Sequence, residues 1–301
     1  MKKKLTIIAT LLILISILSC KKESDKEKNE EKETSTKSPV SENYNISILL
    51  DLSDRISLKK NPNPTMEYYQ RDLGYIKSIS EAFTQHLKSK RIRQIDDKIQ
   101  LFFNPEPLDP EINTIAKNLR ISIDKNNASK DLLNSINKDY ASQTSKIYES
   151  AIKDNKYTGS DIWSFFDSKL KDQCIENKYR NILIIMTDGY MFYENTIMKE
   201  DNRTTYITPE LIRKNGLNTK DWDKKFHDQD FGFIKVNNVP SNLEVLVIGI
   251  NPNHNNPYEE KVIKAYWTKW FTEMKISHFE IKNADLPSNM EKIIKDFILK
   301  N

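Results

Sequence analysis

The chain has 301 residues, of which 47 are basic and 43 are acidic, and it contains two cysteines. Three of the lysines, Lys2 to Lys4, stand at the start of a predicted signal peptide, whose removal would lower the charge excess from +4 to +1. A nearly neutral chain gives no reason to expect nucleic-acid binding. With Cys20 assigned to the signal region, Cys174 has no partner for an internal disulfide, so we expect it to be a small packing residue.

The first 19 residues have the organisation of a lipoprotein signal peptide. Basic residues are followed by an uncharged, mostly apolar stretch at 5–18 and then by Ser19 and Cys20. The apolar stretch is too short to remain as a membrane span. Residues 17–20 resemble the lipobox of bacterial lipoproteins, which implies cleavage before Cys20 and acylation of its thiol, with palmitate among the acyl chains. The alternative is an ordinary signal peptide with a chance cysteine.

Residues 20–43 predict a disordered tether behind the lipidated cysteine. The segment consists almost entirely of charged and small polar residues, which cannot bury enough apolar surface to offset the entropy of ordering. Its lysine-rich, acidic start resembles the surface-export signals of some Bacteroidetes lipoproteins, although a plain spacer has the same composition. We therefore expect a protein anchored by lipid in the bacterial cell envelope, at the outer membrane, facing the periplasm or the cell exterior.

Residues 44–301 predict one α/β domain. Strands are expected at 46–50, 98–103, 119–123, 181–186, 243–249 and 278–281, and helices at 65–87, 130–152, 160–170, 256–274 and 287–299. The near-continuous apolar runs at 181–186 and 243–249 are typical of central strands that are covered on both faces. The alternation of strands and helices predicts a doubly wound, mostly parallel Rossmann-like sheet with helices on both faces.

Two aspartates stand where ligands bind in such a sheet, beyond the carboxyl ends of the strands. Asp51 follows the first strand and Asp188 follows the strand at 181–186, so both are expected at the same edge. A long insertion at about 190–239 leaves this edge and is rich in aromatic and charged residues. We expect it to contact a partner protein, because long insertions in compact domains are usually functional. The alternative is a small cap packed on the sheet through Leu211, Ile212 and Trp222.

Three segments carry a resemblance to a known family. They are Asp51 to Arg55 after a strand, Thr158 to Asp161 at the start of a helix, and Thr187 to Gly189 after another strand. In this order and placement they resemble the metal-ion-dependent adhesion site of von Willebrand factor type A (vWA) domains. The resemblance implies a vWA-like fold and a metal site made of Asp51, Ser53, Ser160 and Asp188. It also implies that the two serines bind the ion directly and that Asp188 acts through water.

The expected ion is Mg²⁺, with Mn²⁺ or Ca²⁺ as alternatives, because hydroxyl and carboxylate oxygens suit hard cations. Arg55 departs from the family pattern, since a serine is expected at its position. Its guanidinium could form a bidentate pair with Asp188 or Asp51 and replace the metal, leaving no cofactor. It could also point away, with the ion's shell completed by water or by another oxygen ligand nearby. The candidates for that ligand are Asp54, Ser57 and Asp161.

We expect an interaction module rather than an enzyme. Its site would accept an acidic side chain from an unidentified protein partner, and it would reach the membrane through its lipid anchor. The alternative is a metal-dependent phosphatase-like hydrolase on a related α/β fold. Haloacid-dehalogenase-type phosphatases also place an aspartate like Asp51 after a strand, but they need a second aspartate two residues later as general acid, and position 53 is serine.

Overall fold

The computed structural model describes residues 42–253 and 255–300. The predicted signal peptide, Cys20 and the tether up to residue 41 lie outside the described residues. In the part of the chain that the structure describes, no helix combines the length and the apolar character needed to cross a membrane.

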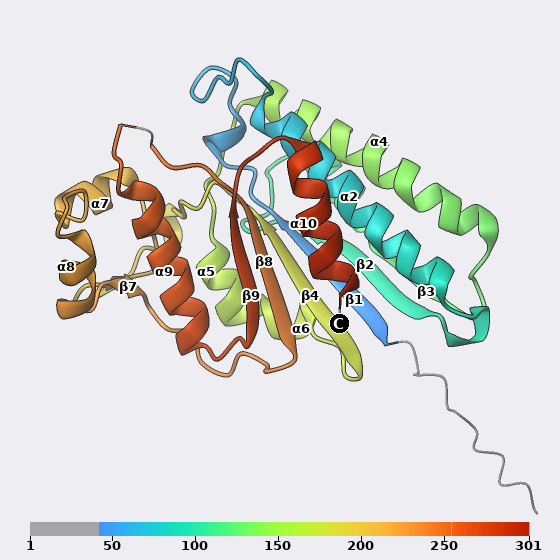
Figure 1. Cartoon of the computed structure of the whole chain (residues 1–301). Coiled ribbons are helices and arrows are strands. Elements are labelled where there is room, and N and C mark those ends of the chain that lie inside the picture. The colour runs from blue at the N-terminus through green and yellow to red at the C-terminus, as the bar shows by residue number, and fades with distance from the viewer. Residues whose placement is uncertain (1–41, 254, 301) are drawn as a thin grey trace, which may run out of the picture. The chain divides into compact units, whose positions relative to one another are not determined.

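A six-stranded sheet lies at the centre of the domain, in the order β3-β2-β1-β4-β8-β9 (Figure 1). Its strands are β1 (Asn43–Leu50), β2 (Asp96–Phe102), β3 (Ile121–Asp124), β4 (Tyr179–Met186), β8 (Leu243–Ile250) and β9 (His278–Asn283). All neighbours pair in parallel except β3, which runs antiparallel to β2 at one edge. The predicted doubly wound, mostly parallel sheet is confirmed.

Side chains of the central strands alternate between two apolar clusters, one on each face of the sheet. In β4, Ile182, Ile184 and Met186 belong to the first cluster, while Leu183 and Ile185 belong to the second. Each of these side chains is at most 1 % exposed. Burial on both faces explains why these strands read as continuous apolar runs rather than as alternating patterns.

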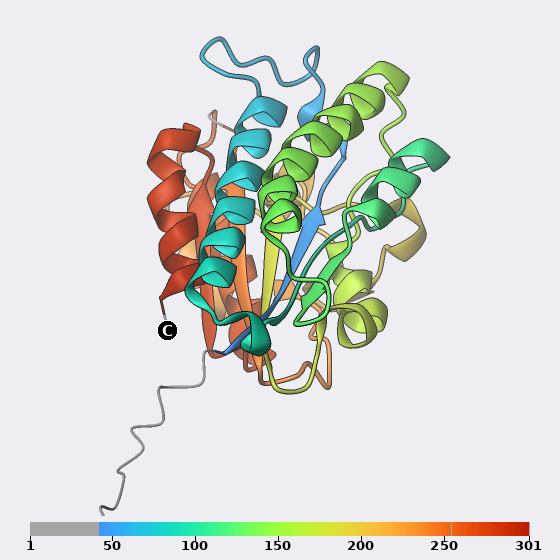
Figure 2. The same ribbon diagram turned by 90° about the vertical axis from the view of Figure 1, so that its right-hand side faces the viewer.

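Helices cover both faces of the sheet. On the first face lie α2 (Tyr68–Ser89), α3 (Pro110–Asn118), α4 (Lys130–Asp154) and α10 (Pro287–Leu299), whose apolar residues join the first cluster. Figure 2 shows α10, α2 and α4 side by side, in red, cyan and green. On the second face lie α5 (Ile162–Ser164), a π-helical turn (Phe165–Lys169), α6 (Leu170–Cys174) and α9 (Glu259–Glu273).

Besides α9, which begins at Glu259 rather than at residue 256, three helical segments differ from the prediction. The first begins at Tyr68 rather than at residue 65, because Glu67 and Gln70 form a capping box there. The second, α3, was not predicted; it starts at Pro110 behind Asp109, whose side chain accepts a bond from the backbone of the first turn. The third, predicted as one helix at 160–170, consists of α5, the π-helical turn and α6.

The predicted insertion forms a small subdomain beside α9. It contains a 3-10 helix (Glu194–Thr196), β5 (Lys199–Glu200), β6 (Arg203–Thr204), α7 (Pro209–Lys214), α8 (Trp222–Asp228) and β7 (Gly232–Phe233). Strands β5, β6 and β7 form a second sheet, and β7 contacts α9. Ile212 is buried in the second cluster and Trp222 packs against that cluster, while Leu211 is buried without belonging to it. The insertion also exposes large apolar side chains, including Phe192.

Candidate functional site at the carboxyl edge of the sheet

Asp51 is fixed at the carboxyl end of β1 by bonds to the end of β4. Its backbone N–H donates to the carbonyl of Met186 at 3.0 Å, which continues the pairing of the two strands. Its Oδ2 accepts a bond from the Thr187 hydroxyl at 2.8 Å, and its Oδ1 accepts one from the backbone of Ser53 at 2.8 Å. The two strand ends therefore meet at one edge of the sheet, as predicted.

Asp188 follows Thr187, and its Oδ1 accepts a bond from the backbone N–H of Tyr190 at 3.0 Å. Burial and then the negative charge of Asp51 raise the pKa of Asp188 to about 8, against a smaller opposing effect of Arg55. Both effects act against the charged form of Asp188, burial through desolvation and Asp51 through repulsion between like charges. A cation between the two carboxylates would remove that repulsion.

The loop that carries Asp188 is attached to the elements on its other side. The Tyr190 hydroxyl donates to Glu259 Oε1 at 2.5 Å and accepts a bond from the backbone of Asn253 at 3.0 Å. The Trp267 indole donates to the carbonyl of Gly189 at 2.9 Å. These bonds hold the loop after β4 against the start and the middle of α9, so Asp188 lies on a rigid support.

Ser160 reaches the same edge from the segment before α5. Its backbone N–H donates to the carbonyl of Phe192, in the loop after β4, at 2.8 Å. Gly159 precedes it with φ +94°, and a Cβ there would lie 2.4 Å from the Phe192 carbonyl oxygen, so glycine is required. The Ser160 hydroxyl is buried, in a residue that is 4 % exposed, and it has no hydrogen-bond partner among the described residues.

Arg55 lies in a 3-10 helix (Asp54–Ile56) and points towards α2. Its Nη2 donates to Asp72 Oδ2 at 2.6 Å, and its Nε donates to the backbone carbonyl of Asp51 at 2.8 Å. Its Nε lies 3.9 Å from Asp51 Oδ2. Of the two alternatives for Arg55, the described contacts show no bidentate pair with Asp188 or Asp51, and the main ion pair is with Asp72. The reason is Asp72, a carboxylate at 2 % exposure that needs a counter-charge inside the domain.

The three alternative ligands are engaged elsewhere. Asp54 forms an exposed ion pair with Lys60 at 2.7 Å. The Ser57 hydroxyl accepts a long bond of 3.4 Å from the backbone of Lys60. Asp161 caps the start of α5, where its two oxygens accept bonds from the backbone and the hydroxyl of Ser164 at 3.1 and 2.7 Å. These bonds give the three side chains structural roles, but like the bonds of Asp51 and Asp188 they leave oxygen lone pairs that a cation could use.

Sequence reasoning missed two residues that shape this region and gave no role to a third, Thr187. Asp72 and the Tyr148 hydroxyl, which donates to Asp72 Oδ2 at 2.7 Å, hold Arg55 in the interior. Thr187 orients the carboxylate of Asp51. A signal for Asp72 was present, because it lies three residues after Tyr69 and four before Ile76, on the apolar face of the helix. A carboxylate on that face needs a buried partner, and Arg55 was the nearby candidate.

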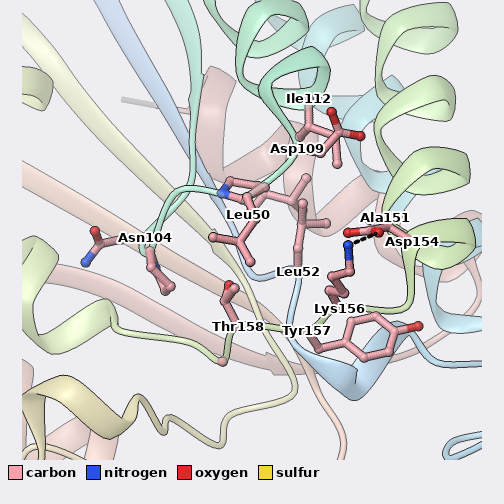
Figure 3. Close-up of a pocket in the computed structure, with 14 residues that line it drawn as sticks. Leu50, Leu52, Asn104, Asp109, Ile112, Ala151, Asp154, Lys156, Tyr157 and Thr158 are labelled. Carbon is pink, nitrogen blue, oxygen red and sulfur yellow. Dashed lines mark ion pairs between the residues drawn. The ribbon is translucent and has the colours of Figure 1, made fainter.

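A narrow pocket opens beside the Ser160 loop (Figure 3). It is lined by Leu50 and Leu52 from the end of β1, by Thr158 and Gly159, and by residues of the loop after β2. An ion pair between Lys156 and Asp154, at 3.1 Å, lies among the residues that line it. With about 20 Å³ it holds little more than one water molecule. A pocket of this size does not fit a small-molecule substrate.

The candidate set, Asp51, Ser53, Ser160 and Asp188, offers hydroxyl and carboxylate oxygens from three segments at one edge. In the described ranges, no three His, Cys, Asp or Glu side chains are grouped as they would be around a metal ion. A site here would instead depend on two carboxylates together with serine hydroxyls. Such a donor set suits a hard cation that retains some of its waters.

Comparisons with known proteins gave no family assignment. No protein-family model matches the chain, and no curated protein matches it significantly. Among solved structures it is similar to the pilus adhesin SpaC from Lactobacillus rhamnosus GG, at 12 % identity and a TM-score of 0.41, over 85 % of this chain. The chain spans about a third of that adhesin, 30 % of its length.

Two further similar structures come from Bacteroides species. An aerotolerance-related membrane protein from Bacteroides fragilis shares 10 % identity with a TM-score of 0.38, over 86 % of this chain and 100 % of that one. BatB from Bacteroides thetaiotaomicron shares 11 % identity with a TM-score of 0.38, over 85 % of this chain and 98 % of that one.

Proposed function

We propose that this protein is a lipid-anchored interaction module of the bacterial cell envelope, with a vWA-like fold and no catalytic activity. It binds a divalent cation, Mg²⁺ before Mn²⁺ or Ca²⁺, through Asp51, Ser53, Ser160 and Asp188. The bound ion accepts a carboxylate from a protein partner. The hydroxyls would bind the ion directly and Asp188 through water, as the resemblance to vWA domains implies.

The observation that carries this proposal is the hydroxyl of Ser160, which has no partner among the described residues and lies in a segment bonded to the loop that carries Asp188. A buried hydroxyl without a partner costs about 1–3 kcal/mol. Burial and then the negative charge of Asp51 raise the pKa of Asp188 at the same edge. A divalent cation would satisfy both groups at once, because it accepts a hydroxyl lone pair and neutralises the two carboxylates.

Arg55 tunes the proposed site without replacing the ion. Its guanidinium is paired with Asp72, so it leaves Asp188 free. Its Nε is still within 3.9 Å of Asp51 Oδ2, and a positive charge at that distance lowers the affinity for a cation. We therefore expect weaker metal binding than at a site with serine in this position, and Arg55→Ser should strengthen it if the domain remains folded.

Thermal unfolding of residues 20–301 with Cys20→Ser tests the proposal. Melting temperatures are compared in EDTA, Mg²⁺, Mn²⁺ and Ca²⁺. An ion at a hundred times its dissociation constant should stabilise the folded state by about 2.7 kcal/mol. Ser160→Ala and Asp51→Asn should abolish the shift, whereas Asp54→Asn, which removes an exposed carboxylate of the same loop, should retain it. An equal shift in Ser160→Ala, or none in the parent chain, would reject the site.

The membrane anchor has a test of its own. Cells that express the chain are labelled with a radioactive fatty acid. We expect label in the parent protein, none in Cys20→Ser, and release of the variant from the membrane fraction. Label that persists in Cys20→Ser would reject Cys20 as the lipidated residue.

A further inference from the structure

Two loops hold the backbone at Ser160 and at the next residue, Asp161, through hydrogen bonds. From the loop after β4, the Phe192 carbonyl accepts the Ser160 N–H at 2.8 Å. From the end of β2, the Asn104 carbonyl accepts the N–H of the next residue, Asp161, at 2.9 Å. Because the hydroxyl of Ser160 makes no bond to any described residue, these backbone contacts are what fix the Cα and Cβ atoms from which it projects.

The side chain of Asn104 adds further hydrogen bonds to the one between its carbonyl and Asp161. Its Nδ2 donates to the Asp161 carbonyl at 2.6 Å and to the Ser164 hydroxyl at 2.9 Å. Asn104 and Asp161 are therefore joined by two hydrogen bonds, one from the Asp161 N–H to the Asn104 carbonyl and one from Asn104 Nδ2 to the Asp161 carbonyl. These bonds connect the end of β2 to the start of α5. Asn104 is 8 % exposed, so water competes little with these bonds.

Lys169 fixes the orientation of this amide. Its ammonium group donates to Asn104 Oδ1 at 2.8 Å, and a lysine can only donate, so the other end of the amide must face the Asp161 carbonyl. Lys169 is the last residue of the π-helical turn. Such turns insert an extra residue into a helix and rotate the residues that follow, and they occur frequently at functional sites. Here the turn places Lys169 against Asn104.

We propose that Asn104 and Lys169 are positioning residues of the candidate metal site, which hold the Ser160 hydroxyl in the direction that a cation needs. This inference rests on the proposed function and adds two residues that neither the adhesion-site motif nor the ligand set contains. They act on the ion through Ser160 and do not touch it. Groups that bond directly to a metal ligand commonly change metal affinity by 10- to 100-fold, and Asn104 acts one residue further away, through the backbone of Asp161.

A purely structural role is the competing explanation, and Asn45 provides the matched control. Asn45 is a fully buried asparagine whose Nδ2 donates to the Cys174 carbonyl at 2.9 Å and to Asn181 Oδ1 at 2.8 Å. It lies near the opposite end of β1 from Asp51. Asn45→Ala should therefore lower stability in the same manner as Asn104→Ala, while leaving the geometry of the site unchanged.

The test is isothermal titration of Mn²⁺ into residues 20–301 with Cys20→Ser, beside urea unfolding of each variant. We expect Asn104→Ala to weaken Mn²⁺ binding about tenfold, at the lower end of the range for direct outer partners. Asn45→Ala should retain the parent affinity, even where both variants lose similar stability. Lys169→Met should weaken binding in the same direction, and Lys169→Arg, which restores a donor, should recover it.

Two outcomes separate this inference from the proposed function. If the parent chain binds Mn²⁺ and both Asn104→Ala and Lys169→Met bind it equally well, the positioning role is rejected and the metal site stands. If the parent chain shows no Mn²⁺ binding, the metal site is rejected and the positioning role with it. Should Asn104→Ala fail to fold, the comparison of Lys169→Met with Lys169→Arg still decides the question, because Lys169 is not fully buried.

Discussion

Arg55→Met should be among the most destabilising single substitutions in the domain, because it leaves Asp72 buried without a counter-charge. The two residues are 5 % and 2 % exposed, and Arg55 Nη2 lies 2.6 Å from Asp72 Oδ2. Removing one partner of a buried ion pair costs about 3–5 kcal/mol. Tyr148 continues to donate a hydrogen bond to the carboxylate, so we expect the lower end of that range, about 3 kcal/mol.

The loss should depend on pH. Burial raises the pKa of Asp72 even though Arg55 and the Tyr148 hydroxyl oppose the shift. Without Arg55, the pKa of Asp72 should rise further. When the pKa of a carboxyl group is higher in the folded than in the unfolded state, the group contributes most to stability at pH values below its ordinary pKa near 3.8. This contribution is lost as the pH rises through the folded-state pKa. Arg55→Met should therefore cost less at pH 5 than at pH 8.

Urea unfolding at both pH values, followed by circular dichroism, measures the change in the free energy of unfolding. Arg213→Met is the control, because Arg213 forms an exposed ion pair with Glu210 at 2.8 Å. Its removal should cost at most about 1 kcal/mol. A loss of less than about 1 kcal/mol in Arg55→Met, or a loss that does not grow with pH, would refute the buried-pair argument.

Three further predictions follow from other parts of the domain. Gly159→Ala should lower the melting temperature and weaken Mn²⁺ binding, because its Cβ would lie 2.4 Å from the Phe192 carbonyl oxygen; an unchanged affinity in calorimetry would contradict this. Asp97 is buried, yet bonds from His86 and Lys90 lower its pKa. Asp97 therefore stabilises the folded state above its ordinary pKa near 3.8, and this contribution is lost as the pH falls through its folded-state pKa. In Asp97→Asn, the free energy of unfolding measured in urea should fall less between neutral and acidic pH than in the parent protein. Burial raises the pKa of Cys174 to about 12, so a thiol reagent should label it in urea and leave the native protein unlabelled over the same time.

The main strands and their polar ends could be predicted from the sequence, because local patterns determine them. Continuous apolar runs such as 181–186 require cover on both faces, and this requirement produces the parallel order in which Asp51 and Asp188 meet. Cys174 was likewise expected to be a packing residue and is buried. These features depend on composition within a few residues and on the general rules for doubly wound sheets.

The partner of Arg55 and the start of α2 were not predicted, because they depend on tertiary contacts. The side chain of Arg55 pairs with Asp72, 17 residues away, rather than with the candidate site, and the hydroxyl of Tyr148 on another helix donates to the same carboxylate. The π-helical turn was also missed, since its apolar pattern at 165–169 reads as an ordinary helix. Pairings across the fold, rather than local propensity, decide such details.

The central claim, that Ser160 and the two strand-terminal aspartates hold a divalent cation, is tested most directly by anomalous diffraction. Crystals of residues 20–301 with Cys20→Ser, grown with Mn²⁺, would be measured on the absorption edge of manganese. The account predicts an anomalous peak with the hydroxyls of Ser53 and Ser160 at direct coordination distance and with Asp51 and Asp188 around it. No peak at this edge of the sheet, with the Ser160 hydroxyl bonded to a protein group instead, would contradict it.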